Sequence, residues 1–573
     1  MFVKEFSGIS GSDGVAIGPV LVYRPAELTV GQCFAGISVQ QQLETYTDIK
    51  RRAADELSAL KAKLSDGNAE QAAIFEAHQD ILDDVVMDDE IKTMVSSGEK
   101  PLDEAISCVY NQYAAIMDGM GDPVFKERAK DIEDVCSRLI RICSGKDASL
   151  PEIKEPSILA AADLLPSDTA SLNRNMILAI VTEKGGQTAH SAIIARSYGI
   201  PALLGVGAFL NEIDNGQTLV VDACDGVLIA EPDAPTLDAY AEKSAAYRKR
   251  AEITAKYLDK DAVMRDGTRI DLTLNIASGS EDELAYAQFA DGVGLFRTEF
   301  LFMGRADLPN EEEQVDKYSR VLTAFGDKPV ILRTLDIGGD KQTPCLDLPQ
   351  EENPFLGKRA LRLCFDQRDI FKTQLRAALR ASVCGRLWLM LPMVGSMDDI
   401  YRAKGVLAEV KAELDRDGIA YAPDVKLGIM IEIPSIALLA DRAAEEVDFA
   451  SIGSNDLCQY LMAADRLNPE VSEYYQSCNP AMFRLIGYVA KAFAVRNKPV
   501  SLCGELGGNA RVAVLLVGLG LRKLSMGADA LPRVKESLSL VSMEEAEAAA
   551  KKVCGMCTGK EVEEYLQREF SLN

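Results

Sequence analysis

Histidine and tryptophan are scarce in this chain. Its 573 residues include only two histidines, His78 and His190, and a single tryptophan. A histidine is therefore a rare residue here, and the surroundings of each one are informative. Long apolar stretches are missing too, because the longest run, Val512–Leu521, is too short to cross a bilayer. We expect no membrane insertion.

The N-terminal sequence MFVKEFSGISGSDG lacks the apolar core of a secretory signal peptide. The 13 cysteines are scattered and odd in number, which suits a reducing compartment. The single C-x-x-C motif, Cys554–Cys557, has no second pair to complete a metal site, so we interpret it as two thiols on a helix face. These features predict a cytoplasmic protein.

Acidic residues outnumber basic ones by 88 to 62, which gives a net charge of −26. Such a surface argues against nucleic-acid binding and favours a well-solvated protein. It would also repel small anions. A local cluster of arginines in this chain therefore requires a functional explanation.

Four regions differ in their apolar pattern. Short β-like runs in residues 1–25 have no core of their own, so we expect them to pair with the strands and helix of residues 144–233 in one α/β domain. Residues 26–143 show helical apolar spacing and form an inserted helical bundle in this prediction. A charged helical stretch, 234–261, would be the linker to the remainder.

Residues 262–573 contain eight strand-like apolar runs separated by helical stretches. The runs are IDLTLNIA, GVGLF, PVILRTL, LWLMLPMV, KLGIMIEI, FASIG, PVSLCG and KLSMG. Eight such alternations over about three hundred residues predict a closed (β/α)₈ barrel. A doubly wound open sheet is the structural alternative.

Polar residues follow the strand-like runs, where a barrel has its chemistry. The residues at five of these ends are Arg297, Arg333 (with Asp336 three residues on), Glu432, Asp456 and Cys503. A single polar residue there could simply mark the boundary between a strand and a loop. Five such strand ends that converge on one face of the barrel predict a functional site there.

Four arginines in or near these ends indicate a multiply charged anion, since guanidinium groups bind carboxylate and phosphate through two bonds. They are Arg297, Arg333, Arg359 and Arg466. Glu432 and Asp456 offer a small number of hard oxygen ligands, which suits Mg²⁺. Zinc is disfavoured because neither histidine lies in this region. We predict a small phosphorylated carboxylate held by arginines and Mg²⁺.

Cys503 has two interpretations. A free cysteine is most often a small buried apolar residue. At a strand end beside anion-binding groups, its thiol could instead be a general acid.

His190 stands in the stretch GGQTAHSAIIAR, directly after the strand-like run MILAIVTE. Two glycines allow close backbone approach, and a helix beginning near Thr188 places His190 in its first turn. The N-terminus of a helix favours an anion and disfavours an imidazolium, so the ring would be neutral and nucleophilic. This position predicts a phosphate-accepting histidine. An ordinary surface or core histidine at a helix start is the alternative.

Taken together, the motifs resemble those of Enzyme I of the bacterial phosphoenolpyruvate:sugar phosphotransferase system, from Gly8 to about Ala530. GGQTAHSAIIAR resembles the family's phosphohistidine motif. The barrel motifs follow in order as GVGLFRTEFLFM, RTLDIGGDK, NPFLGKRALR, GIMIEIPS, SIGSNDLCQYLMAADR and CGELGG.

This resemblance implies an enzyme that transfers the phosphoryl group of phosphoenolpyruvate to its own His190 and then to the phosphocarrier protein HPr. It implies a swivelling α/β phosphohistidine domain, an inserted helical domain that docks HPr, and a barrel that forms a homodimer. It further implies that Cys503 protonates the enolpyruvate carbon and that Thr169 hydrogen-bonds the histidine. The residues that would bind phosphoenolpyruvate are Arg297, Arg333, Arg359, Arg466, Asn455 and the backbone of Asp456, with Glu432 and Asp456 holding Mg²⁺.

The departures from the family pattern are small. Gln187 and Ala189 replace the usual Arg and Ser beside the histidine, and Ser454 replaces a Thr. None of these changes removes a catalytic group.

The helical region carries His78 in IFEAHQD, a motif that also resembles the family. An acidic face suited to a basic partner follows it, with Asp80, Asp83, Asp84 and residues 88–90. The alternatives are a core-packing histidine and a merely solvated charged face.

Two competing functions remain at this stage. A dikinase-type phosphoenolpyruvate enzyme shares a similar histidine domain and barrel, but it needs a large nucleotide-binding domain, and no Gly-rich phosphate loop is present here. A non-catalytic relative with the same fold is the other alternative.

Overall fold

The computed structural model divides the chain into two compact units, Met1–Ala251 and Glu252–Asn573. The residues that it describes are 4–24, 33–34, 36–65, 69–118, 123–144, 153, 155–164, 168, 173–185, 190–303, 305, 307–338, 343, 345–346, 348 and 351–570. Thr169, Gln187 and Ala189 lie outside the described residues, and so does the side chain of His190.

The first unit contains an eight-stranded sheet in the order β1-β8-β7-β3-β4-β5-β6-β2. Its strands are β1 (Lys4–Ser7), β2 (Ile9–Ser12), β3 (Val15–Tyr23), β4 (Ser157–Ala161), β5 (Ile177–Thr182), β6 (Ala202–Leu204), β7 (Thr218–Asp222) and β8 (Val227–Ala230). The N-terminal strand β3 lies in the middle, parallel to β4 and antiparallel to β7. The sheet therefore joins segments that are more than a hundred residues apart.

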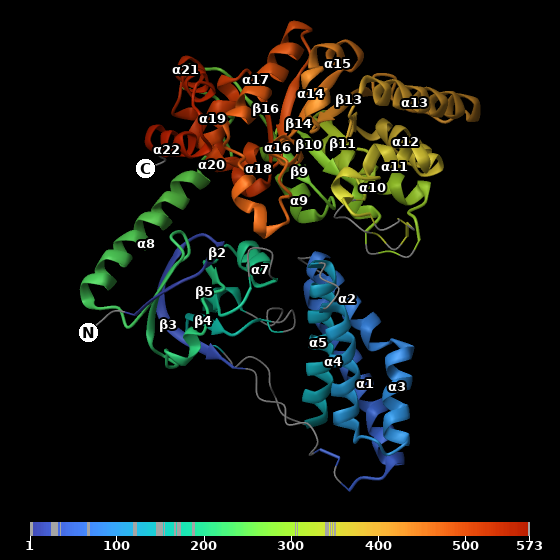
Figure 1. Cartoon of the computed structure of the whole chain (residues 1–573), viewed down its shortest axis with the longest axis vertical. Helices are drawn as coiled ribbons and strands as arrows, with labels where there is room; N and C mark the ends of the chain where they lie inside the picture. Colours follow the sequence, from blue (N-terminus) through green and yellow to red (C-terminus); the bar gives the residue numbers. More distant parts are fainter. Residues whose placement is uncertain are drawn as a thin grey trace. The chain divides into compact units, whose positions relative to one another are not determined.

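Five helices lie in the sequence between β3 and β4, with an apolar core of their own. They are α1 (Val39–Ser65), α2 (Ala69–Leu82), α3 (Val85–Ser96), α4 (Leu102–Asp118) and α5 (Pro123–Ser144). Helix α7 (His190–Tyr198) instead packs on one face of the sheet, where Ala192 and Ala195 share a core with Leu159 and Ile180. Helix α8 (Ala234–Ala255) follows the sheet (Figure 1).

The second unit is a closed barrel of eight parallel strands, which confirms the predicted (β/α)₈ barrel and rules out the open sheet. Its strands are β9 (Asp271–Ile276), β10 (Val293–Arg297), β11 (Pro329–Arg333), β12 (Arg386–Leu391), β13 (Lys426–Ile431), β14 (Phe449–Gly453), β15 (Val500–Cys503) and β16 (Lys523–Met526).

Helices surround the barrel strands (Figure 1). They are α9 (Glu281–Ala285), α10 (Glu311–Phe325), α11 (Ala360–Asp366), α12 (Arg368–Ala381), α13 (Met397–Asp417), α14 (Pro434–Leu438), α15 (Ala440–Glu446), α16 (Ser454–Met462), α17 (Pro480–Val495), α18 (Glu505–Gly508), α19 (Ala510–Gly518), α20 (Leu531–Ser539), α21 (Met543–Cys554) and α22 (Gly559–Glu569). Short 3₁₀ helices are η1 (Arg174–Met176), η2 (Phe209–Asn211), η3 (Tyr286–Phe289), η4 (Thr298–Leu301), η5 (Pro354–Leu356), η6 (Ser382–Cys384), η7 (Pro469–Tyr474) and η8 (Ala528–Ala530).

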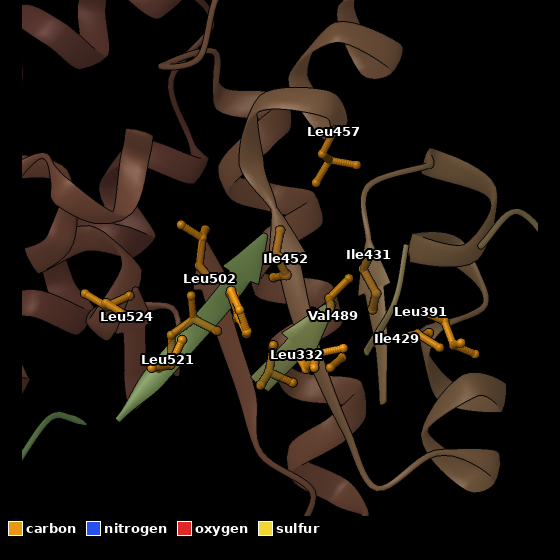
Figure 2. Close-up of a cluster of buried hydrophobic side chains, with 14 of the residues drawn as sticks. Leu332, Leu391, Ile429, Ile431, Ile452, Leu457, Val489, Leu502, Leu521 and Leu524 are labelled. Atoms are coloured by element: carbon orange, nitrogen blue, oxygen red, sulfur yellow. The ribbon is translucent and has the colours of Figure 1, made fainter. Parts of the chain in front are cut away.

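Side chains of the barrel strands alternate between two cores, as the period of two in a strand requires. One set packs outward against the helices, and Figure 2 shows part of it, with Leu332, Ile431, Ile452 and Leu502. The other set fills the barrel interior and comprises Leu295, Ile331, Trp388, Met390, Met430, Phe449 and Cys503. This alternation decides which way the last residue of each strand points.

Within the described part of the chain, none of the helices combines the length and the apolar composition that crossing a bilayer requires.

Candidate active site

Strand alternation turns the predicted polar residues into the barrel. Arg297 follows the interior Leu295 by two positions, Arg333 follows Ile331, and Glu432 follows Met430, while Cys503 is itself an interior residue. They line one cavity of about 330 Å³ at the C-terminal ends of the strands. The predicted residues along its wall are Arg297, Arg333, Glu432, Asn455, Asp456, Arg466 and Cys503.

Arg333 is buried and held by two carboxylates. Its Nη2 lies 2.5 Å from Glu299 Oε1, and its Nη1 lies 3.0 Å from Asp336 Oδ2. Burial disfavours the charge of Arg333, but the attraction of Glu299 and Asp336 outweighs this and raises its pKa. The guanidinium therefore stays charged and fixed in orientation at the cavity wall.

Arg359 is the one predicted arginine outside the cavity lining. It is only 1% exposed, and its Nη2 lies 2.9 Å from Asp336 Oδ1 and 3.2 Å from Asp456 Oδ2. Asp336 thus bridges Arg333 and Arg359. From behind the cavity wall, Arg359 positions the carboxylate of Asp456, and its contact with a ligand stays a prediction.

The carboxylate of Glu432 is positioned by unusual backbone. Its Oε1 accepts a hydrogen bond from the N–H of Met393 at 2.5 Å, and Met393 has a φ of +50°, which is strained for a residue other than glycine. Gly453 faces the same carboxylate, since a Cβ there would lie 2.8 Å from Glu432 Oε2. The absence of a side chain at Gly453 leaves room for Glu432.

Glu432, Asp456 and Asp336 form a buried acidic group. Burial first, and then repulsion from Asp456 and Asp336, raise the pKa of Glu432. A cation beside Glu432 and Asp456 would relieve this repulsion. Over the described residues, no set of three or more His, Cys, Asp or Glu side chains could hold a metal ion alone. Two carboxylates completed by ligand oxygens and water suit Mg²⁺, so the donor set fits that ion.

Cys503 lines the cavity although it is only 2% exposed. Its thiol donates to the carbonyl of Ile452, with a sulfur–oxygen distance of 3.6 Å. Burial raises the pKa of Cys503. The thiol is therefore protonated at neutral pH and can donate a proton into the cavity.

The loops after β14 and β15 are tied together beside Cys503. Ser454 Oγ donates to the carbonyl of Cys503 at 3.0 Å, and Asn455 Oδ1 accepts from the N–H of Glu505 at 3.2 Å. Gly504 has a φ of +106°, and a Cβ there would lie 2.3 Å from Ser454 Oγ. The loops can approach this closely because residue 504 is glycine.

The sequence analysis missed some positioning residues. It gave Asp336 no role, although its spacing of three residues from Arg333 could have signalled the ion pair between them. It also overlooked Glu299, whose ion pair with Arg333 joins two strand ends and leaves no local signal. The backbone contribution of Met393 has no signal in the sequence.

The other histidine of the chain, His78, lies buried in the helical bundle. His78 is 0% exposed, its Nε2 lies 3.1 Å from Asp131 Oδ1, and its ring makes an edge contact with Phe75 at a centroid distance of 5.6 Å. These contacts support the core-packing interpretation.

His190 is the first residue of α7, the helix after β5. Gly185, three residues after the end of β5 at Thr182, has a φ of +102°, a conformation that favours glycine. The sequence predicted a helix beginning near Thr188 with His190 in its first turn, and the backbone of His190 is in the first turn of α7.

Comparison with known protein families shows the broad class of enzyme to which this chain belongs. Three family models match this chain: the N-terminal region of phosphoenolpyruvate-utilising enzymes over residues 7–128, their mobile domain over 153–226, and their phosphoenolpyruvate-binding domain over 251–543. These matches cover the helical insertion, the sheet with His190 and the barrel with its cavity, so the chain is a phosphoenolpyruvate-utilising enzyme.

Curated relatives narrow the class to one family. The phosphoenolpyruvate-protein phosphotransferase of Priestia megaterium is 40% identical over 99% of this chain and 100% of its own length. That of Bacillus subtilis is also 40% identical, over 99% and 100%, and that of Staphylococcus aureus is 39% identical, over 98% of both chains. This chain belongs to the phosphoenolpyruvate-protein phosphotransferase family. The comparisons give no support to the dikinase-type alternative.

Proposed function

We propose that this enzyme transfers the phosphoryl group of phosphoenolpyruvate to its own His190 and then to the phosphocarrier protein HPr, as the first step of a sugar phosphotransferase system. The observation that carries the proposal is the barrel cavity. There, Arg297, Arg333 and Arg466 face the pair Glu432 and Asp456, with a protonated thiol in the wall. The reaction needs positively charged groups that bind the carboxylate and phosphate of the substrate, a pair of carboxylates that bind Mg²⁺, and a proton donor.

The arginines bind the charged groups of phosphoenolpyruvate and orient its phosphorus toward the open side of the cavity. A neutral ring nitrogen of His190 attacks the phosphorus, a nitrogen–phosphorus bond forms, and the bond to the enol oxygen breaks. The electron pair leaves as the enolate of pyruvate. Cys503 gives its proton to the methylene carbon of that enolate and regains one from water. Mg²⁺, held by Glu432 and Asp456, would neutralise phosphoryl charge.

The helical bundle offers a surface for HPr. At the start of α3, the apolar side chains of Val85 and Val86 are 69% and 59% exposed. Asp83 and Asp89 are exposed beside them in the sequence, whereas Asp88 is paired with Lys50 and Lys92. An apolar patch with acidic neighbours suits a partner with a basic face.

We assign the steps to separate parts of the chain. Residues 1–25 with 144–233 carry His190, residues 26–143 dock HPr, residues 234–261 are the linker, and residues 262–573 bind phosphoenolpyruvate. The family resemblance further leads us to propose a cytoplasmic homodimer joined through the barrel, which sedimentation equilibrium of the full chain would test.

Pyruvate release tests the proposed reaction against its nearest rival. With phosphoenolpyruvate and Mg²⁺, sustained release should require HPr and should match the amount of HPr phosphorylated. AMP, the acceptor of a dikinase-type enzyme, should not replace HPr. Release that depends on AMP and ignores HPr would contradict the proposal.

The raised pKa of Glu432 predicts that Mg²⁺ competes with a proton. Between its ordinary pKa and the raised one, the folded chain binds more protons than the unfolded chain, so metal-free stability should fall as pH rises. Deprotonated Glu432 binds Mg²⁺ better, so the gain in melting temperature from Mg²⁺ should grow over the same range. Thermal unfolding with and without Mg²⁺ measures this gain. Glu432→Gln should lose the pH dependence, and an equal gain at every pH in the parent would contradict the prediction.

Gly453→Ala should disturb the Glu432 carboxylate, because the new Cβ would lie 2.8 Å from Oε2. We expect the Mg²⁺ concentration for half-maximal pyruvate release to rise by about tenfold, as for loss of a well-placed ligand neighbour. Gly395→Ala is the matched control at another loop of the barrel, where the nearest atom to a Cβ would be 3.6 Å away. Equal Mg²⁺ requirements in both variants would show that Gly453 does not position Glu432.

A further inference from the structure

A fully buried glutamine on α12, Gln374, lies outside the residues that line the cavity. Its Oε1 accepts a hydrogen bond from the backbone N–H of Leu335 at 2.8 Å. Its Nε2 donates to the hydroxyls of Thr298 at 3.0 Å and Tyr318 at 3.2 Å. Because a backbone N–H can only donate, the bond from Leu335 determines which end of the amide is oxygen.

Two of these partners closely follow the strands β10 and β11, whose last residues are the cavity arginines Arg297 and Arg333. Thr298 directly follows Arg297, and Leu335 lies between Arg333 and Asp336. Thr298 Oγ1 also donates to the carbonyl of Arg333 at 2.8 Å. One side-chain amide therefore connects the C-terminal ends of β10 and β11.

The series of hydrogen bonds continues from Tyr318 to residues that do not line the cavity. Tyr318 donates to Gln314 Oε1 at 3.0 Å, and Gln314 Nε2 donates to the carbonyl of Pro309 at 3.1 Å. Gln314, Tyr318 and Gln374 are each at most 1% exposed. Burying so many polar groups costs free energy unless every group is bonded, and a fully bonded network holds a single geometry. Because apolar side chains could fill the same space, filling it does not explain this network. What the network adds is a fixed position for the C-terminal ends of β10 and β11.

We propose that Gln374 is a positioning residue for phosphoenolpyruvate, which sets the spacing of Arg297 and Arg333 through Thr298 and Leu335. The inference rests on the proposed function of the cavity and adds a residue beyond its walls. Gln374 touches neither substrate nor reacting atoms in this account. Its effect should therefore appear in substrate affinity.

Calorimetric titration of phosphoenolpyruvate with Mg²⁺ into a His190→Ala chain, which cannot turn over, tests this. Adding Gln374→Met keeps the length of the side chain and removes its three hydrogen bonds, so the Kd should rise by about tenfold. No binding to the His190→Ala chain itself would overturn the proposed function and this inference with it. Binding that Gln374→Met leaves unchanged would overturn the inference alone.

Tyr318→Phe is the matched control. It removes the two bonds of the Tyr318 hydroxyl, to Gln374 and to Gln314, and leaves the bonds of Gln374 to Leu335 and Thr298. We expect both variants to melt at lower temperature, but Tyr318→Phe should bind phosphoenolpyruvate like its parent. If both substitutions weakened phosphoenolpyruvate binding equally, Gln374 would have a structural role only. If Gln374→Met does not fold, Thr298→Val takes its place in the titration. This substitution removes the hydrogen bond to the Arg333 carbonyl with little change of shape. Unchanged affinity for phosphoenolpyruvate would then refute the inference.

Discussion

His190→Ala is expected to abolish labelling of the chain by radioactive phosphoenolpyruvate while leaving phosphoenolpyruvate binding intact. The cavity proposed to bind the substrate is lined by residues of the second unit, whereas His190 belongs to the first. The substitution removes the nucleophile that is proposed to attack the phosphorus of phosphoenolpyruvate. Label retained on the denatured protein, separated from free substrate, is the measurement.

The other histidine is the matched control. His78→Ala removes the same side chain at a position that is buried against Asp131 and Phe75 in the helical bundle. It should accept label normally and, at most, be slower in passing it to HPr. Robust acid-labile label on the His190→Ala chain would contradict the assignment of the nucleophile.

Cys503→Ala should slow pyruvate formation by ~10²–10⁴-fold, the usual cost of losing a general acid. Burial raises the pKa of the Cys503 thiol, which keeps its proton available for the enolate. Phosphoenolpyruvate should still bind, since the arginines are unchanged. Steady-state pyruvate release and calorimetric binding together separate the two effects.

Cys458→Ala serves as the control for this change. Cys458 is also a buried cysteine, on α16, and is not among the residues that line the cavity. It should release pyruvate at nearly the parental rate. Parental rates in Cys503→Ala as well would return Cys503 to its simpler interpretation as a packing residue of the barrel interior.

Much of the barrel site could be predicted because its signals are local. Eight apolar runs predict the strands, and polar residues at their ends are brought together by closure of the barrel. The period of two then explains why Arg297, Arg333 and Cys503 point inward. None of these steps needs information about distant side chains.

The remainder depends on contacts between segments far apart in the sequence. Arg359 was predicted to bind substrate, and that role stays a prediction. What the sequence did not indicate is that Arg359 is buried between Asp336 and Asp456, the latter 97 residues away. Gln374 gives no signal either, because an amide on a helix looks like any polar residue until its partners are known. The strain at Met393 is a property of the folded backbone alone.

The sharpest test of the proposed phosphoryl transfer follows radioactive phosphorus from phosphoenolpyruvate to the chain and then to HPr. Phosphoenolpyruvate labelled in its phosphoryl group is incubated with the full chain and Mg²⁺, and HPr is added afterwards. We expect acid-labile label on the chain in step with released pyruvate, followed by its loss from the chain and its appearance on HPr. Pyruvate released without label on the chain, or label that never passes to HPr, would contradict it.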